Sequence, residues 1–546
     1  MGYPYHFVSL SPEQDTRRRQ LLNGYGQFAQ LSILLVPLLY QLGLGFRLLI
    51  SRLWRGSGYG LVKGHQSPVV AGSMQRNRED FGGWVRLRWA LDEELVEGWG
   101  TRGQWLAAGV WASWLVLLAV KDTGDVAASQ LPLHYALALK SRSPIQYLTR
   151  LSHEELNPYH RFLGRIIATL MSVHATLYLN FYVQNSLLIK RVQDIDVILG
   201  LTAISTALLI NTTALSIIRT WSYRLFFYLH VILSLTILPV LYFHVSYLRV
   251  YILEAGAIYI LLIIQRNIDQ SPANATIKSL PSTTLISITV PLPNSLASRT
   301  FTPGQHIYVG FPSLPQKLRI NPFSIANPHP NADKKLHLVV RAMNGTTAML
   351  ADLAKDPQPI PLLIEGPYGS AKYFPELASN YDRVLLVAGG VGATFTLPIY
   401  RDLLSKGKGS IVKFVWSVKR EADAQWGVEA LKEQCEGRLP DSFELYVSRK
   451  ATSISSRRGK DDESIELQER EGLLGEEALS EETVRKGRPD IPAIVDEVFA
   501  LSRAGEERVA VLVCGPSGLG ASVRKEVGRW VTKGRDVFWH AEEFGW

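Results

Sequence analysis

Long apolar runs fill the first half of the chain, whereas the second half alternates short apolar runs with polar breaks. A helix needs about 20 predominantly apolar residues to cross a bilayer. On this criterion, and on helical periodicity, we predict a multi-pass membrane domain with seven spans. They cover residues 28–50, 103–120, 127–140, 160–182, 196–218, 224–245 and 250–266. The 127–140 segment is the shortest, and it holds His134 and Lys140.

The predicted spans divide the first half into two parts. Residues 1–102 hold a polar lead up to residue 27, the first span and a basic loop, and residues 103–270 form an α-helical membrane domain. From residue 278 the pattern changes to short runs rich in β-branched residues, such as TTLISITVP and KLHLVVRAM. Such runs are typical of strands, so we predict an antiparallel β-barrel over residues 278–372.

A third pattern begins at residue 380, where buried-strand runs such as RVLLVAGG and VAVLVCGP alternate with helical segments. This alternation predicts a parallel α/β sheet over residues 380–546. Residues 454–493 are strongly charged and poor in aromatic side chains. We expect them to be a disordered insertion in the sheet domain.

Four histidines stand out within the apolar runs. One predicted span holds His160 and His174, another holds His230 and His244, and each pair is 14 residues apart. Fourteen residues are close to four helical turns, so each pair shares one helix face, with its members about 21 Å apart along the axis.

Ionisable side chains inside a membrane commonly mark a functional site, and neutral imidazole is a standard axial ligand of haem iron. A single helical histidine is more often a satisfied core residue. Two equal spacings on two spanning runs instead favour ligands from facing helices. We therefore predict two haems b, one held by His160 and His230 and the other by the second member of each pair.

The net charge of +9 is modest for 546 residues, and the basic residues are spread along loops. We interpret them as signals of membrane orientation and expect no nucleic-acid partner. Their excess in the 51–102 loop predicts that this loop and the C-terminal half are cytosolic, although Arg17, Arg18 and Arg19 oppose this orientation. Both cysteines lie in the C-terminal half and fit a reducing compartment there. The first apolar run is too long for a cleavable signal peptide, so we expect the endoplasmic reticulum or the plasma membrane.

Two glycine-rich turns follow predicted strands in the sheet domain. The first, VAGGVGATFTLP, places Gly389, Gly390 and Gly392 where a strand meets the start of a helix. Glycines there let the backbone approach phosphates, and the helix N-terminus favours their negative charge. Tight packing between strand and helix is the alternative interpretation. The second turn, CGPSGL, has the same arrangement from Cys514 onward, where the cysteine is either functional or a structural strand-end residue.

Three further segments are candidates for cofactor contacts. VSRK offers Ser448 and Arg449 at a strand end, which suits an adenosine 2′-phosphate or is a solvated charge run. In RINPFSIAN, Arg319 precedes Phe323 and the segment opens with an Asn-Pro turn. The chain ends on an aromatic, Trp546, which can stack on a planar cofactor.

These segments, in this order, resemble the ferric reductase transmembrane family, which also contains the NADPH oxidases. The resemblance extends from the spans near residue 103 to the last residue. It is carried by the paired histidines, HRFLGR, PGQH, NPFSIAN, EGPYG, VAGGVGAT, CGP and the terminal aromatic. The short N-terminus, one extra leading span and the acidic insertion are similar to a small fungal branch of probable metalloreductases or reticulum NADPH oxidases.

The resemblance implies a flavin site in the barrel. Phe323 is expected to stack on the flavin ring of FAD and Ser324 to hydrogen-bond near its N5, within a motif that also includes Arg319 and Pro322. The residues expected to grip the flavin pyrophosphate are Arg341, Gly345 and Thr347. Relatives commonly have His-Pro-Phe where this chain has Asn321, which keeps hydrogen-bonding capacity but lacks a titratable ring.

The resemblance also implies an NADPH site in the sheet domain. The glycines Gly389, Gly390 and Gly392 are expected to border the NADPH phosphates. The residues expected to face the nicotinamide are Cys514, Gly515 and Pro516, with Trp546 covering the flavin until NADPH displaces it.

The sequence therefore predicts an NADPH-dependent oxidoreductase that passes electrons through FAD and two haems b across a membrane. The acceptor is a ferric or cupric ion in a metalloreductase, or dioxygen in a superoxide-generating NADPH oxidase. One alternative is a haem-binding membrane scaffold without turnover, motivated by Asn321 and the insertion. Another is a transporter with a histidine proton relay, which the matched spacing disfavours.

Overall fold

The computed structural model describes residues 11–35, 38, 41–42, 85–96, 99–120, 122–140, 143–312, 321–343, 345–356, 358–448, 484–500 and 507–543. The chain divides into two compact units. The first, called here the helical unit, comprises residues 1–64 and 91–267. The second, the barrel–sheet unit, comprises residues 65–90 and 268–546.

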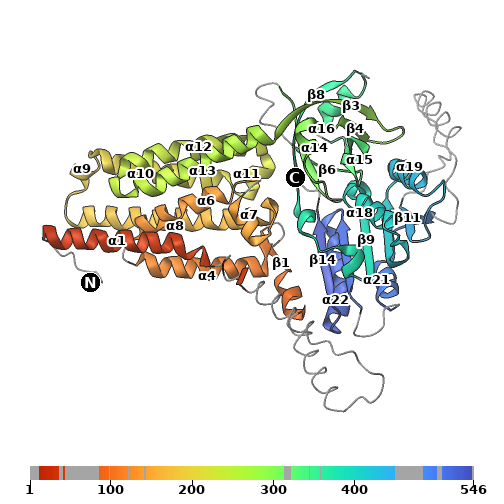
Figure 1. The fold of residues 1–546 in the computed structure, drawn as a ribbon. Coiled ribbons are helices and arrows are strands. Elements are labelled where there is room, and N and C mark those ends of the chain that lie inside the picture. Colours follow the sequence, from red (N-terminus) through yellow and green to blue (C-terminus); the bar gives the residue numbers. More distant parts are fainter. Residues whose placement is uncertain are drawn as a thin grey trace, which may run out of the picture. The chain divides into compact units, whose positions relative to one another are not determined.

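The described part of the helical unit is a bundle (Figure 1). Its longer helices are α1 (Pro12–Ser32), α4 (Arg102–Ala119), α8 (His153–Gln184), α10 (Ile195–Thr213), α12 (Tyr223–His244) and α13 (Arg249–Asp269). Shorter elements are β1 (Glu94–Val96), β2 (Gly100–Thr101), α5 (Thr123–Ser129), α6 (Leu131–Ala136), α7 (Pro144–Thr149), α9 (Leu188–Arg191), α11 (Ser216–Trp221) and η1 (Ser246–Leu248). Within the described residues, four helices are long and apolar enough to cross a membrane: α8, α10, α12 and the run Ser246–Asp269.

The structure does not confirm all seven predicted spans. Residues 12–27, expected as a polar lead, belong to α1, because Ser11 caps its N-terminus and Pro12 occupies its first turn. Most of the predicted 28–50 span lies outside the described residues. Five other predicted spans each coincide mainly with one helix, namely α4, α8, α10, α12 and α13, and the 196–218 span also runs into the start of α11.

The prediction of a single span over 127–140 is wrong. The segment instead forms part of α5 and all of α6, with the junction at Gln130. Pro132 has no N–H group and lies in the first turn of α6, where a missing donor is tolerated. The chain therefore turns between two short helices, and His134 falls in the last turn of α6.

Apolar side chains from most of these helices form one core. Helix α10 packs against both α8 and α12, and α5 packs against α1 and α8. The core includes Leu115 of α4, Leu163 of α8, Ala203 of α10, Leu238 of α12 and Ala255 of α13. Small residues such as the two alanines allow helix backbones to approach closely. This packing positions α8 and α12, which carry the four predicted ligands.

The predicted antiparallel barrel is confirmed in the barrel–sheet unit. In chain order, its strands are β3 (Gln270–Ser279), β4 (Leu285–Pro291), β5 (His306–Gly310), β6 (Asn321–Ser324), β7 (Lys335–Arg341) and β8 (Ile360–Tyr368). Neighbouring strands follow the spatial order β6-β5-β8-β3-β4-β7. A bridge between Ile325 and Leu338 joins the two ends of this order. Strand β3 begins at Gln270, directly after α13 and before the predicted start at residue 278. The sequence did not predict this part of the strand because QSPANATIKS contains Pro and Asn, which disfavour strands.

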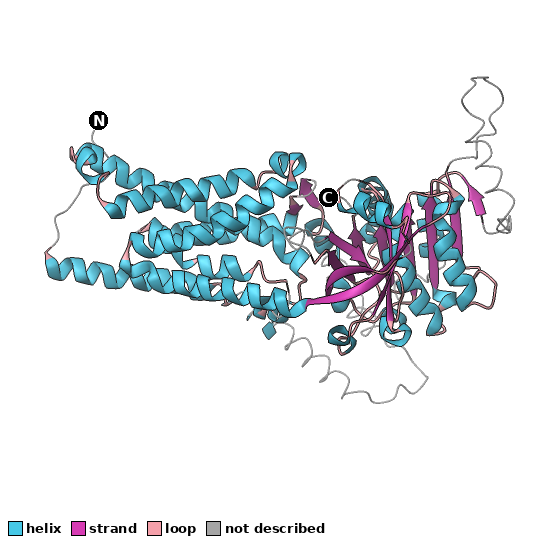
Figure 2. Ribbon diagram, turned by 90° about the horizontal axis from the view of Figure 1, so that it is seen from above, coloured by secondary structure: helices cyan, strands magenta, loops and turns pink. Residues whose placement is uncertain are grey.

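The predicted parallel sheet is also confirmed. In chain order, its strands are β9 (Arg383–Gly389), β10 (Val412–Val418), β11 (Phe443–Val447), β12 (Val484–Lys486), β13 (Val509–Cys514) and β14 (Val537–Glu542). Neighbouring strands follow the spatial order β12-β11-β10-β9-β13-β14. The helices α18 (Ala393–Ser405) and α19 (Gln425–Gln434) pack in one core, and α21 (Ile491–Ala500) and α22 (Ser517–Thr532) pack in another (Figures 1 and 2).

The predicted insertion over 454–493 extends too far. Its last part forms strand β12, in which Val484 pairs with Leu445, and the start of α21. A three-residue edge strand carries too little apolar pattern to be seen in a charged segment. The rest of the insertion, up to residue 483, lies outside the described residues.

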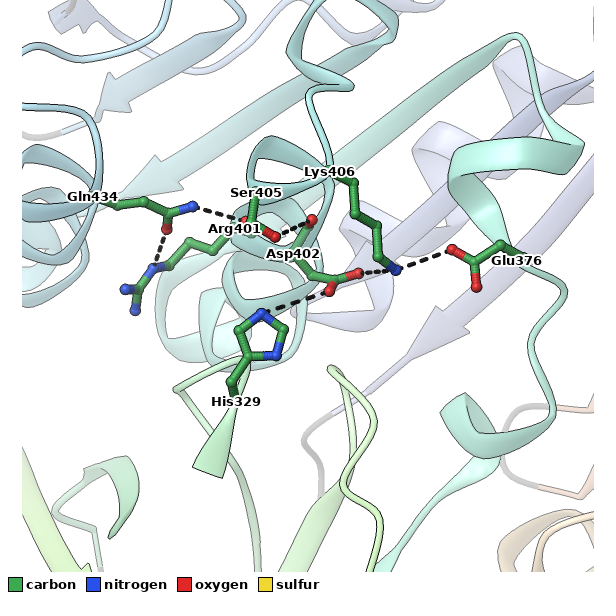
Figure 3. A network of polar contacts seen from close by, with 7 residues as sticks. All are labelled: His329, Glu376, Arg401, Asp402, Ser405, Lys406 and Gln434. Atoms are coloured by element: carbon green, nitrogen blue, oxygen red, sulfur yellow. Dashed lines mark hydrogen bonds and ion pairs between the residues drawn. The ribbon is translucent and has the colours of Figure 1, made fainter. Parts of the chain in front are cut away.

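A polar network links the barrel to the sheet within this unit (Figure 3). His329, at the start of α15 (Pro330–Asp333), lies 3.7 Å from the carboxylate of Asp402 on α18. Lys406 bonds both Asp402, at 2.8 Å, and Glu376, at 3.0 Å. Exposed ion pairs contribute about 0–1 kcal/mol each, so this network orients the two parts more than it stabilises them.

A segment that precedes α4 packs on the sheet of the barrel–sheet unit. Val85 is buried in the core beside α22, and the Trp89 ring lies 5.6 Å from the Trp539 ring on β14. Arg524 of α22 lies over Trp89 at 4.4 Å and donates a 2.8 Å bond to its carbonyl. The basic 51–102 loop therefore supplies residues to the C-terminal half. This contact supports the prediction that both lie on the same side of a membrane.

We expect Trp89→Ala to lower the free energy of unfolding of the barrel–sheet unit by about 1–3 kcal/mol, because it leaves a gap and removes the cation–π contact with Arg524. Thermal unfolding of the full-length protein, followed by tryptophan fluorescence, measures this change. Leu87→Ala is the matched control, since Leu87 is exposed in the same segment. Equal destabilisation by both substitutions would contradict the packing role of Trp89.

Candidate functional site

The His160 and His230 rings lie close together, with centroids 6.3 Å apart and planes at 64°. Two imidazoles that share one metal ion, each about 2 Å from it, have centres roughly 6 Å apart. The observed separation therefore fits a common iron between α8 and α12. It brings together two residues that are far apart in the sequence.

Hydrogen bonds fix the protonation of two predicted ligands. The Nδ1 atom of His160 lies 3.0 Å from the backbone oxygen of His134, and Nδ1 of His244 lies 2.7 Å from that of Asp196. A carbonyl can only accept, so both Nδ1 atoms are donors. The Nε2 lone pair of each neutral ring is then left for a metal, an arrangement typical of metal-binding histidines.

Glycines make room for the rings. A Cβ atom on Gly124 would lie 2.6 Å from Nδ1 of His174, and one on Gly200 would lie 2.7 Å from Cε1 of His244. Real Cβ atoms do not approach so closely, so larger residues at these positions would displace the rings. Near His174, Asp122 caps α5 by accepting bonds from two backbone N–H groups, and its carboxylate lies 3.9 Å from the ring.

In the barrel, the predicted flavin residues lie on strand β6 itself. Phe323 pairs with Ile307 of β5 and is half-buried against the barrel core, and Ser324 is buried. Pro322 lies beside them in the same strand. The strand thus presents the PFS motif at the edge of the β5–β6 pair.

The predicted pyrophosphate residues gather where β7 ends. Arg341 is the last residue of β7, and Gly345 caps α16 (Thr346–Leu353) with a positive φ of 67° that favours glycine. The Thr347 hydroxyl accepts a 3.0 Å bond from the Met343 N–H. A cation beside the N-terminus of an eight-residue helix suits a phosphate. Arg341 also lies 3.3 Å from where a Cβ of Gly390 would be, which links this region to the sheet domain.

The two glycine-rich turns meet at one point of the parallel sheet. Strands β9 and β13 are neighbours, with Ala388 opposite Cys514, although the chain leaves them toward opposite edges of the sheet. Ligands of such sheets bind at the carboxyl ends of the strands where the order reverses. A Cβ on Gly389 would lie 2.8 Å from Pro516, and one on Gly392 would clash with the Cys514 carbonyl. The glycines are therefore needed for this close approach.

Cys514 is fully buried at the end of β13. Burial raises the pKa of its thiol well above the usual range, and the carboxylates of Glu542 and Glu543 raise it further. The thiol is therefore neutral at physiological pH. It does not resemble a reactive cysteine, which needs an exposed, electropositive setting.

The remaining predicted contacts are only partly described. Ser448 follows β11 at the same carboxyl edge, and its hydroxyl donates a 3.1 Å bond to the Val418 carbonyl. Arg319, Arg449 and Trp546 lie outside the described residues.

The sequence did not assign a role to His134. Its ring is stacked on that of His160, with centroids 4.1 Å apart and planes at 7°. The only sequence signal for a role of His134 was its position in a weakly apolar segment. The direction of its ring depends on the break between α5 and α6, which the sequence did not predict.

Family models match three successive regions of the chain. A ferric reductase-like transmembrane component matches residues 123–241, an FAD-binding domain residues 270–372, and a ferric reductase NAD-binding domain residues 381–528. The first contains three of the four predicted haem ligands and ends three residues before His244. The second covers the barrel, and the third covers the sheet up to α22.

Individual proteins match across most of the chain. The probable metalloreductase AIM14 of Meyerozyma guilliermondii is 24% identical over 74% of this chain and 79% of its own length. That of Yarrowia lipolytica is 26% identical over 76% and 86%. Ferric/cupric reductase transmembrane component 2 of Schizosaccharomyces pombe is 24% identical over 75% and 78%.

Each relative covers part of both units, because its share of this chain is larger than either unit alone. The order of the three matched regions is the order expected from the sequence. The chain therefore carries a ferric reductase-like transmembrane component, an FAD-binding domain and a ferric reductase NAD-binding domain, in that order.

Proposed function

We propose that the protein transfers electrons from NADPH through FAD and two haems b to a ferric or cupric ion on the other side of a membrane. The observation that carries this proposal is the pairing of His160 with His230 at the separation required by a shared iron. The metal acceptor is suggested by relatives named probable metalloreductase and ferric/cupric reductase. Bound FAD would accept a hydride and bound haem would carry single electrons.

Two histidine pairs are proposed to hold the haems. Within each helix the two ligands are four turns apart, so one pair lies near each end of the spanning segments. The Nδ1 atoms of His160 and His244 are held by backbone carbonyls, so in the neutral ring Nε2 is the nitrogen that would bind iron. His174 and His230 complete the proposed pairs.

An arginine cluster supports an anionic group near the first pair. Arg161 and Arg165 of α8 lie within electrostatic reach of Arg219 on α11. Glu94 also lies within electrostatic reach of Arg161, and a cluster of like charges in an apolar bundle favours further anions nearby. The two propionates of a haem provide such anions, and His160 is adjacent to Arg161 on the same helix.

In the barrel–sheet unit we propose that the motifs on β6, β7 and α16 bind FAD and that the turns after β9 and β13 bind NADPH. The close approach of Gly389 to Pro516 leaves backbone groups exposed where the strand order reverses. Buried Cys514 stays a neutral, protonated thiol next to the proposed nicotinamide position, so it adds no charge there. Ser448 and Arg449 would favour NADPH over NADH.

A multi-pass location in the endoplasmic reticulum or plasma membrane, with the C-terminal half cytosolic, completes the proposal. The packing of Trp89 on the sheet is consistent with a loop and a C-terminal half that share one side.

The proposal predicts a b-type visible spectrum for detergent-purified protein, reduced by NADPH under anaerobic conditions and reoxidised by a ferric chelate. His160→Ala and His174→Ala should each remove about half of the haem, because each removes one axial ligand. Haem-to-protein ratios measure this loss. His329→Ala, a half-exposed histidine of the barrel–sheet unit, is the control and should keep both haems. The metal acceptor would be refuted if dioxygen, which is thereby reduced to superoxide, reoxidised the reduced protein and ferric or cupric chelates did not.

Gly392→Ala should weaken NADPH binding by about 5- to 150-fold, because overpacking against the Cys514 carbonyl costs about 1–3 kcal/mol. Stopped-flow reduction of the flavin over a range of NADPH concentrations gives this value. Gly520→Ala is the control, since it follows the CGPSGL turn in α22 and its Cβ position has only an ordinary contact, 3.9 Å from Glu543. Haem content should be unchanged in both variants. An unaltered NADPH dependence in Gly392→Ala would rule out this turn as the nucleotide site.

Because a thiol stays protonated at every pH below its pKa, the raised pKa of Cys514 predicts that its ionisation does not affect the rate of flavin reduction between about pH 6 and 9. The pH profiles of wild type and Cys514→Ala should have the same shape. A limb of the wild-type profile that disappears in Cys514→Ala would show that the thiolate forms in this range.

A further inference from the structure

We propose that His134 is a positioning residue for His160, which sets the orientation of that ligand and thereby the properties of one haem. This inference rests on the proposed function, since it concerns a haem ligand. It goes beyond that function because His134 is not one of the paired ligands. Three contacts of His134 and one unpaired ring atom carry it.

The first contact is at the edge of the ligand ring. The backbone oxygen of His134 accepts a 3.0 Å bond from Nδ1 of His160. Helix α6 ends at Ala136, and the N–H groups that follow it bond the carbonyls of Leu133, Tyr135 and Ala136, whereas the carbonyl of His134 accepts from the imidazole. The short helix thus leaves an acceptor for the imidazole, which a continuous span over 127–140 would have used for its own backbone.

The second contact is on the face of the ligand ring. The His134 side chain is stacked on His160 with centroids 4.1 Å apart and planes at 7°. The carbonyl fixes the tautomer of His160, and the stacked ring restricts rotation of the ligand about its side-chain torsions. One residue therefore constrains both the edge and the plane of the ligand. Ligand orientation and basicity are the properties through which neighbouring groups tune a bound metal.

The third contact shows that α8 is shaped for this ring. Gly164, one turn after His160, would place a Cβ 2.9 Å from Cε1 of His134. A larger residue there would push His134 off its ligand. At the other proposed pair a glycine also makes room for a histidine ring, since Gly124 lies against the proposed ligand His174.

The fourth observation is that the His134 ring holds no hydrogen bond at Nδ1, although this atom is buried. A buried polar atom without a partner is unfavourable by about 1–3 kcal/mol, so an apolar side chain of similar size would be more stable there. Packing alone therefore does not explain a histidine. A stacking partner for a ligand ring does, because the aromatic face is what His160 contacts.

The test compares His134→Leu with His134→Phe in full-length, haem-loaded protein. Leucine fills the space without an aromatic face, whereas phenylalanine restores the face without a ring nitrogen. Redox titration followed by visible spectra, and electron paramagnetic resonance of the oxidised haems, report on each haem separately. We expect His134→Leu to keep both haems but to shift the midpoint potential and resonance of one. His134→Phe should return both signals toward wild type.

Three glycine variants provide a second arm that leaves His134 itself intact. Gly164→Ala should shift the same haem as His134→Leu, whereas Gly124→Ala should shift the other haem through His174. Gly109→Ala on α4, where nothing lies within 4 Å of the Cβ position, should shift neither. This arm remains informative if a substitution of His134 prevents folding.

Several results would overturn the inference. Unchanged signals in His134→Leu would show that His134 does not orient the ligand, and an equal shift in His134→Phe would exclude the stacked face as the cause. Loss of a haem in His134→Leu combined with its retention in His160→Leu would make His134 the ligand instead. Absence of haem from the wild-type protein is a different outcome, because it would refute the proposed function itself.

Discussion

Two hydrogen bonds from imidazole rings to backbone carbonyls determine what the helical unit can bind. Each carbonyl can only accept, so Nδ1 of His160 and of His244 carries the proton and Nε2 is left with a lone pair. The surrounding elements follow from this requirement. The short helix α6 ends where its carbonyl can reach His160, and the first turn of α10 places Asp196 beside His244. Glycines next to the rings keep the space that these bonds need.

The barrel–sheet unit depends on a comparable constraint of close approach. Strands β9 and β13 are adjacent and parallel, so the turns that follow them end at the same edge. The two turns touch only because Gly389 and Gly392 have no side chains. The contact of Arg341 with the turn at Gly390 then connects the barrel to this edge. The candidate flavin and nucleotide segments are thereby brought together although they lie far apart in the sequence.

Much of this arrangement could be read from the sequence because its signals are periodic or local. The 14-residue spacing of the histidines needs only helical geometry, and each pair indeed lies on one helix. Glycines at strand ends indicated the nucleotide turns, since a backbone that approaches phosphate tolerates little else. The barrel and the parallel sheet followed from strand patterning, whereas the edge strand β12 was too short and polar to be detected.

The sequence by itself determined the spans that carry the four histidines, the equal spacing of the two histidine pairs and the order of the domains, because apolar periodicity and motif spacing are properties of the chain alone. Only the tertiary structure decided the break between α5 and α6, the stacking of His134 on His160 and the packing of Trp89 on the sheet. These features depend on contacts between distant segments. A side chain's partner across such a contact is fixed by packing, which no local pattern records.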